Sequence, residues 1–209
     1  RVYQSVNVNG NYSLNGNINY DLKIKKPEIN IGLGTNFGAN RYKNIVNDAA
    51  NETNQKNIGF DFRISKSKQK KYDLSLSSSA NYTTSNSSIQ QSVNIHYWTY
   101  SLHPDIDIFF PLKFQVHTDC EFNIRQKTSA FDNNLNTTYW NAWIGKKFFK
   151  QESLLIKIQA NDILDQHIGF ERSVNSNYIS QNTYTTIRRY FMFSIIWNFT
   201  KAGGVQPNP

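Results

Sequence analysis

Six acidic and imidazole side chains recur at alternate positions near the middle of the chain, and these residue types are the ones best suited to chemistry. They fall in two series: His103, Asp105 and Asp107, then His117, Asp119 and Glu121. In an extended strand, alternate residues lie on the same face, so each series would point in one direction. Carboxylates and imidazoles bind divalent cations, and they are also common general acids and bases. The two series therefore indicate a cation site or an acid–base pair if their strands are neighbours.

The segment between the two series indicates that they meet. The stretch FFPLK, residues 109–113, contains Pro111, which has no N–H to donate to a strand ladder, and it predicts a tight turn. Antiparallel pairing about this turn brings the two series together. The expected partners are Asp107 with His117, Asp105 with Asp119, and His103 with Glu121.

The same residues also have a plainer interpretation, which we favour. They would form a polar wall whose negative charge is balanced by Lys147, by Arg125 or by a further protein domain. On this interpretation we expect no enzymatic activity, no cofactor and no firm metal site. An enzyme that uses the six residues for catalysis stays open as an alternative.

The elements that would position these side chains are long strands. From residue 12 to residue 24, every even position is apolar, aromatic or Gly, and every odd position is polar. A period of two over this length predicts a β-strand with one apolar and one polar face, and we expect this strand to cover about residues 2–24. Strands of soluble proteins are usually about five or six residues long. The excess length predicts a strand that crosses a membrane, with its apolar face toward lipid, and projects beyond it.

The alternation recurs along the whole chain, and the connections are of two kinds. Apolar phases follow over residues 28–42, 58–64, 72–82, 98–110, 114–124, 140–144, 154–160 and 187–199. Short turns containing Lys or Pro alternate with longer loops rich in Asn, Ser and Thr. This pattern predicts an all-β, antiparallel up-and-down transmembrane β-barrel. We count nine strands, or ten if the first segment turns at Asn9–Gly10; the unbroken even phase favours nine.

Composition limits the other classes of protein. No run approaches the roughly 18 apolar residues of a membrane helix. The net charge is +8, but the lysines gather at turns and not along one face, which argues against a nucleic-acid partner. A soluble β-sandwich that serves as a binding module is an alternative, although its strands would be shorter. A small, self-closing porin-like barrel is another.

The end of the chain resembles a known family. The supporting stretches are NDILDQ at residues 161–166, SNYI at residues 176–179 and RRYFMFSIIWNF at residues 188–199. They resemble the C-terminal β-barrel region of TonB-dependent receptor-like outer-membrane proteins, which are common in Bacteroidetes. The resemblance covers most of the chain.

Several expectations follow from this resemblance. The intact protein would take up a nutrient with energy from the TonB system, and a plug domain would lie upstream. The barrel-assembly machinery would read the last strand as a signal, through Phe193, Ile195, Trp197 and Phe199.

The resemblance and the strand count together suggest how the chain is placed. Residues 1–200 would be the C-terminal strands of a larger barrel in the bacterial outer membrane, and residues 201–209 a flexible tail. The short turns would be periplasmic and the long loops extracellular. Loops 43–56, 126–138 and 165–182 would then form the surface for the ligand, whose identity stays open.

Overall fold

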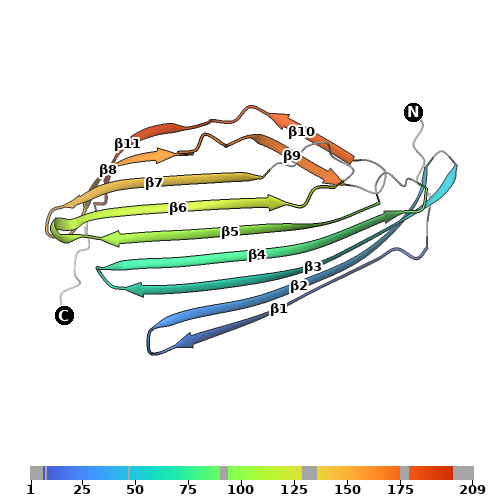
Figure 1. The fold of residues 1–209 in the computed structure, drawn as a ribbon, viewed down its shortest axis with the longest axis horizontal. Helices are drawn as coiled ribbons and strands as arrows, with labels where there is room; N and C mark the ends of the chain where they lie inside the picture. Colours follow the sequence, from blue (N-terminus) through green and yellow to red (C-terminus); the bar gives the residue numbers. More distant parts are fainter. Residues whose placement is uncertain are drawn as a thin grey trace, which may run out of the picture.

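The fold is an antiparallel β-sheet built in chain order (Figure 1). The computed structural model describes residues 7, 9–46, 48–89, 94–128, 136–174 and 179–199. The strands are β1 (Tyr12–Ile24), β2 (Ile29–Val46), β3 (Ala49–Lys68), β4 (Tyr72–Ser87), β5 (Ile95–Phe109), β6 (Phe114–Arg125), β7 (Thr137–Phe148), β8 (Leu154–Asn161), β9 (Gly169–Val174), β10 (Ile179–Tyr184) and β11 (Tyr190–Trp197).

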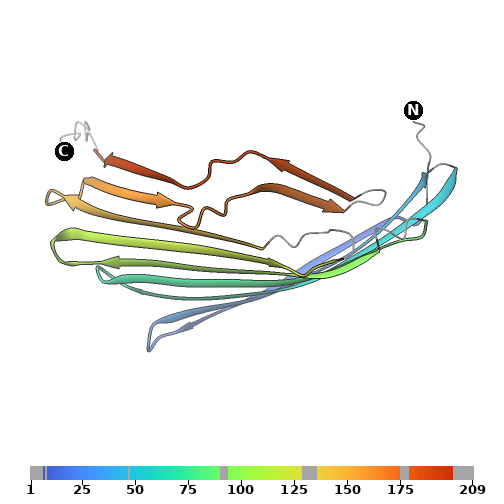
Figure 2. The same ribbon diagram turned by 45° about the horizontal axis from the view of Figure 1, so that its top comes forward.

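Nine of these strands form one sheet in the order β1-β2-β3-β4-β5-β6-β7-β8-β11. Each strand pairs antiparallel with its neighbour, while β9 and β10 pair only with each other. The all-β, up-and-down architecture expected from the sequence is therefore confirmed. In the described residues β1 and β11 are the two edges, so the sheet is curved but not closed (Figure 2).

The short connections lie together at one end of the sheet, on the left in Figure 1. They join β1 to β2, β3 to β4, β5 to β6 and β7 to β8, and the third is the expected turn, a 3-10 turn at Pro111–Lys113. The β2–β3 connection and the β9–β10 pair lie at the opposite end. The turns that contain Lys or Pro are thus gathered at one end, as the sequence predicts.

The prediction of a long loop at residues 43–56 is wrong, because β2 and β3 continue through these residues. β2 extends to Val46 and β3 begins at Ala49, with Lys43 opposite Glu52 in the ladder. Polar side chains predominate on both faces of this extension, so it lacks the alternation by which the sequence reveals a strand. The extension is long: β3 has 20 residues, whereas about 9 to 11 suffice to cross a bilayer.

The prediction of a loop at residues 165–182 is also wrong, since the hairpin of β9 and β10 lies there. The NDILDQ stretch leads the chain from β8 into this hairpin. Asp162 is 5% exposed, and its carboxylate accepts hydrogen bonds from the backbone N–H groups of Gln166 and His167, both at 2.9 Å. Asp165 forms an ion pair with Arg188 at 3.2 Å, which ties the start of the hairpin to its exit.

The ends of other elements differ from expectation by a few residues. The first strand begins at Tyr12, and Gly10 before it has a φ of +90° in the left-handed region, so the strand does not continue through it. The last strand begins at Tyr190 instead of residue 187, and β7 includes Thr137. The tail at 201–209 and the middle of the 126–138 loop lie outside the described residues.

The apolar side chains lie on an exposed face, not in a core. Ile18 is 64% exposed, Phe60 50% and Phe193 62%. Among the described residues, Ile95 is the one buried hydrophobic side chain. A soluble sandwich would bury its apolar face between two sheets, so the structure does not favour that alternative. In the described part of the chain, no helix has the length and apolar character to span a membrane.

Candidate functional site

The two series of acidic and imidazole residues do meet on β5 and β6. Asp107 is opposite His117 and Asp105 is opposite Asp119, which confirms the expected register. The ladder is interrupted at Pro104, which has no N–H, and resumes unchanged with Leu102 opposite Phe122. The long, regular alternation of both strands and the tight turn at Pro111–Lys113 bring these side chains to one face.

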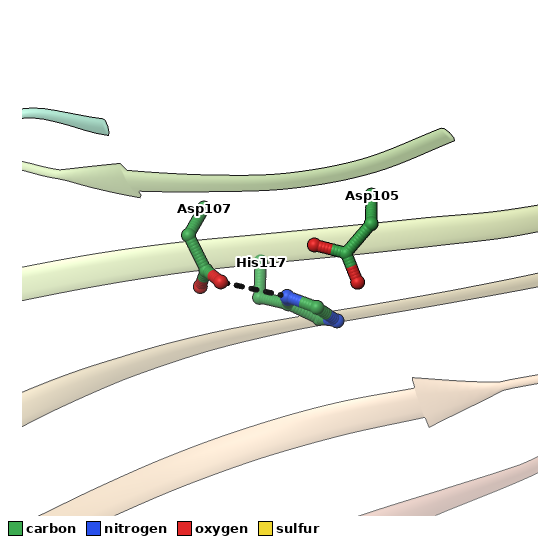
Figure 3. Close-up of side chains that lie close together, drawn as sticks. All are labelled: Asp105, Asp107 and His117. Carbon is green, nitrogen blue, oxygen red and sulfur yellow. Dashed lines mark ion pairs between the residues drawn. The ribbon is translucent and has the colours of Figure 1, made fainter. Parts of the chain in front are cut away.

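His117 is the centre of the group. Its Nδ1 lies 3.3 Å from Oδ2 of Asp107, and its Nε2 lies 3.2 Å from Oδ1 of Asp119. The His117 side chain is 18% exposed and each of the two carboxylate side chains 23%. Figure 3 shows the Asp107 carboxylate facing one ring nitrogen of His117, with the Asp105 carboxylate near the same ring. One donor atom from each of Asp105, Asp107 and His117 lies within 4.8 Å of the other two.

Neighbouring polar side chains hold the carboxylates in place. The Gln115 side-chain amide donates to Oδ1 of Asp107 at 2.9 Å. The Asn141 side-chain amide, from β7, donates to Oδ2 of Asp119, also at 2.9 Å. Both carboxylates around His117 therefore have a second partner that restricts their rotation.

An aromatic residue that the sequence did not single out completes the site. The ring of Trp143 on β7 is stacked on the imidazole of His117, with centroids 5.5 Å apart and an interplanar angle of 22°. Lys157 Nζ on β8 lies 5.0 Å from the Trp143 ring centroid. One feature of the sequence could have identified Trp143: it lies in the polar phase of its strand, whereas the other tryptophans lie in the apolar phase of theirs.

Two of the six predicted residues do not join the donor set. His103 and Glu121 lie beyond Pro104 and are not a ladder pair. The Glu121 carboxylate accepts a hydrogen bond from the Asn123 side chain at 2.8 Å. Asp105, Asp107, His117 and Asp119 are thus the part of the predicted group that the fold brings together.

The expected balancing cations lie elsewhere. Lys147 forms an ion pair with Glu152 at 3.4 Å, near the short turns. The guanidinium of Arg125 lies 4.1 Å from the centre of the Tyr97 ring. Among the described residues, the ion pairs of Asp107 and Asp119 are both with His117, and none joins these carboxylates or Asp105 to a lysine or arginine.

Elsewhere on the polar face, glycines lie opposite large polar residues of the neighbouring strands. Gly34 on β2 lies between Asn19 on β1 and Asp61 on β3. A Cβ at Gly34 would be 2.9 Å from Oδ1 of Asn19 and 3.2 Å from the Asp61 Cβ. A polar depression of about 540 Å³, lined in part by Gly34, Arg63 and Ser77, lies on the same face.

The predicted assembly segment lies at an edge of the sheet. Phe193, Ile195 and Trp197 of β11 are on its apolar face and are 62–64% exposed. Phe199 lies two residues beyond the end of β11, and its ring is 5.9 Å from that of Trp197. Three of the four residues are therefore in the last strand.

An ion pair joins β2 and β3 in their extension, the part that exceeds the length needed to cross a bilayer. Arg41 Nη2 lies 2.5 Å from Oε2 of Glu52, and Lys43 Nζ lies 3.8 Å from the same oxygen. The hydrogen bonds from Arg41 and Asn54 lower the pKa of Glu52. The pair stabilises the extension without apolar packing.

Comparison with known proteins agrees with this architecture. The model of the outer membrane protein beta-barrel family matches residues 2–197, nearly the whole chain. No curated protein and no solved structure matches the chain. The match accounts for the exposed apolar face, and it supports a location in the outer membrane, where lipid covers that face.

Proposed function

Because this chain belongs to the outer membrane protein beta-barrel family, we propose that it supplies barrel wall and extracellular segments to a TonB-dependent receptor for nutrient uptake. The single observation that supports this role most is the length of the strands at one end. β2, β3 and β4 have 18, 20 and 16 residues, well beyond the roughly 9 to 11 that cross a bilayer.

The projecting ends give a barrel a surface on which to capture a ligand. The β2–β3 extension and the β9–β10 hairpin lie at the same end of the sheet (Figure 1). The Arg41–Glu52 ion pair stabilises the β2–β3 extension. Contacts of Asp162 and Asp165 stabilise the start of the β9–β10 hairpin. In this proposal these segments face outside and the short turns face the periplasm.

The sheet itself does not favour a small self-closing barrel, because β1 and β11 are edges that do not pair in the described residues. The intact receptor would contain further strands and a plug domain. Its partners would be outer-membrane lipid, the barrel-assembly machinery and the TonB system, with no cofactor and no enzymatic activity.

Uptake by cells that carry the intact protein tests the proposed function. Cells with and without the gene are grown on a mixture of nutrients, and depletion of each nutrient is followed with and without a protonophore. We expect at least one nutrient to be taken up only with the protein and only with an energised inner membrane. Uptake that continues with the protonophore would show a passive pore and overturn the proposal, as would identical depletion by both strains.

Labelling of intact cells tests the proposed orientation. In a Cys120→Ser background, Asp48→Cys places a thiol at the β2–β3 connection and Lys70→Cys places one at a short turn. A membrane-impermeant maleimide should label position 48 on intact cells, and position 70 only after the outer membrane is opened. The reverse pattern would contradict the orientation.

A further inference from the structure

We propose that Asp105, Asp107 and His117 bind one divalent transition-metal ion on the polar face of the sheet. This inference does not depend on TonB-driven uptake. It concerns the pair of strands β5 and β6, whose register is fixed over most of their length.

The donor atoms are close to the separation that a metal ion requires. One nitrogen of His117 and one oxygen from each of Asp105 and Asp107 lie within 4.8 Å of one another. Zinc binds such atoms at about 2.0–2.2 Å, which places neighbouring ligand atoms about 3 to 4 Å apart. His117 Nδ1 and Asp107 Oδ2 are already 3.3 Å apart. The Asp105 carboxylate, near the same ring in Figure 3, would be the third ligand.

The imidazole is oriented as metal-binding imidazoles are. Its Nδ1 is directed toward Asp107, and its Nε2 lies 3.2 Å from Asp119. A histidine that binds a metal through one nitrogen usually donates its other N–H to a carboxylate. Asp119 has that position here and is itself held by Asn141 at 2.9 Å. Trp143, stacked on the imidazole at 5.5 Å, restricts rotation of the ring further.

The charge around the site independently favours a cation. Asp105, Asp107 and Asp119 are each half-buried, and in the described chain no lysine or arginine forms an ion pair with them. Asp73 lies opposite Asp107 on β4 and adds a further carboxylate. Carboxylates this close together repel one another. A divalent ion between Asp105 and Asp107 would offset that repulsion.

The ligand types select the class of metal. An imidazole with two carboxylates suits zinc and its first-row neighbours, while calcium and magnesium prefer ligand sets made of oxygen alone. The three ligands come from one face, so further positions on the ion would be open to water. We therefore expect Zn²⁺ and Co²⁺ to bind, and Ca²⁺ and Mg²⁺ to bind at least tenfold more weakly.

Titration of the intact protein in detergent micelles with Co²⁺ and Zn²⁺ tests the site. We expect one equivalent of Co²⁺ to give visible absorption bands, and Zn²⁺ to displace it. His117→Ala and Asp105→Asn should each weaken binding at least tenfold. Asp105→Asn is the safer variant, because it keeps the shape of the side chain and leaves both ion pairs of His117 in place.

His103→Ala is the matched control, since His103 lies on the same face of β5 but outside the donor set. It should bind Co²⁺ as the unchanged protein does. Heat-modifiable migration on a gel verifies that each variant is folded. The proposal is overturned if the unchanged chain shows no saturable binding, or if Asp105→Asn binds as well as the unchanged protein does. Equal loss in His103→Ala would also overturn it, since the ion would then lie elsewhere.

Discussion

The ring of Phe37 lies over Gly16, its partner across the β1–β2 ladder on the apolar face of the sheet. A Cβ at position 16 would lie 2.4 Å from Cζ of Phe37, closer than any side-chain contact allows. An aromatic ring that covers a glycine in a neighbouring strand protects the exposed backbone and fixes the register. The only break in the apolar series of β1 is therefore part of its packing.

This contact makes a prediction about two positions together. Gly16→Ala should destabilise the protein by about 1 to 3 kcal/mol, the usual cost of overpacking, because the Phe37 ring must move. Phe37→Ala in the same chain should remove most of that added cost. The free energy of unfolding in liposomes, measured for both single variants and the double variant, gives the coupling. If the changes in the free energy of unfolding of the two single variants simply add in the double variant, the proposed role of the contact is wrong.

A charge on the apolar face of β1 should be far more costly than one on its polar face. Ile18 is 64% exposed on the apolar face, and Ile18→Arg should cost about 2 to 4 kcal/mol, as for arginine facing the middle of a bilayer. Asn19→Arg is the control on the polar face, next to Gly34. The measurement is again unfolding in liposomes. Equal losses for the two variants would mean that the faces are wrongly assigned.

Asp162 should hold the start of the β9–β10 hairpin. Asp162→Ala leaves the N–H groups of Gln166 and His167 without their acceptor, which typically costs about 1 to 3 kcal/mol. We expect faster hydrogen exchange at these two amides. Glu171→Ala, an exposed site on β9, is the control and should leave both rates unchanged. Unaltered exchange in Asp162→Ala would contradict this role.

The Arg41–Glu52 pair gives the β2–β3 extension a pH dependence. The Arg41 guanidinium and the Asn54 amide lower the pKa of Glu52 in the folded state. A carboxyl with a lowered pKa contributes stability above its unfolded pKa, and that stability is lost as the pH falls through the folded value. Hydrogen exchange in residues 41–54, corrected for its intrinsic pH dependence, should show less protection at acid pH. Glu52→Gln should remove the change; an unchanged profile in that variant would assign it to another group.

The sequence predicted those parts of the fold in which one face is apolar. Alternation located β5 and β6, and the proline turn then placed Asp107 opposite His117 correctly. Where polar side chains predominate on both faces, the alternation disappears, although the backbone still pairs. The sequence therefore predicts loops where the β2–β3 extension and the β9–β10 hairpin lie, because neither shows a regular apolar face.

The candidate site shows the same limit. Strand phase was enough to group Asp105, Asp107, His117 and Asp119. Phase alone could not show that His103 and Glu121 stay outside the donor set, beyond the interruption of the ladder at Pro104. It also could not reveal Trp143, whose partner depends on the pairing of β6 with β7.

The most direct test of the central claim, a wall with one face toward lipid and one toward the lumen, uses two tryptophans on β7. Trp140 is 39% exposed on the apolar face, and Trp143 is stacked on His117 on the polar face. Two variants each keep one of these tryptophans and have phenylalanine at the other three tryptophan positions. Both are placed in liposomes of brominated phospholipid, which quenches tryptophan on contact. Strong quenching of Trp140 and little quenching of Trp143 is the predicted result. Equal quenching of both, or stronger quenching of Trp143, would contradict the account.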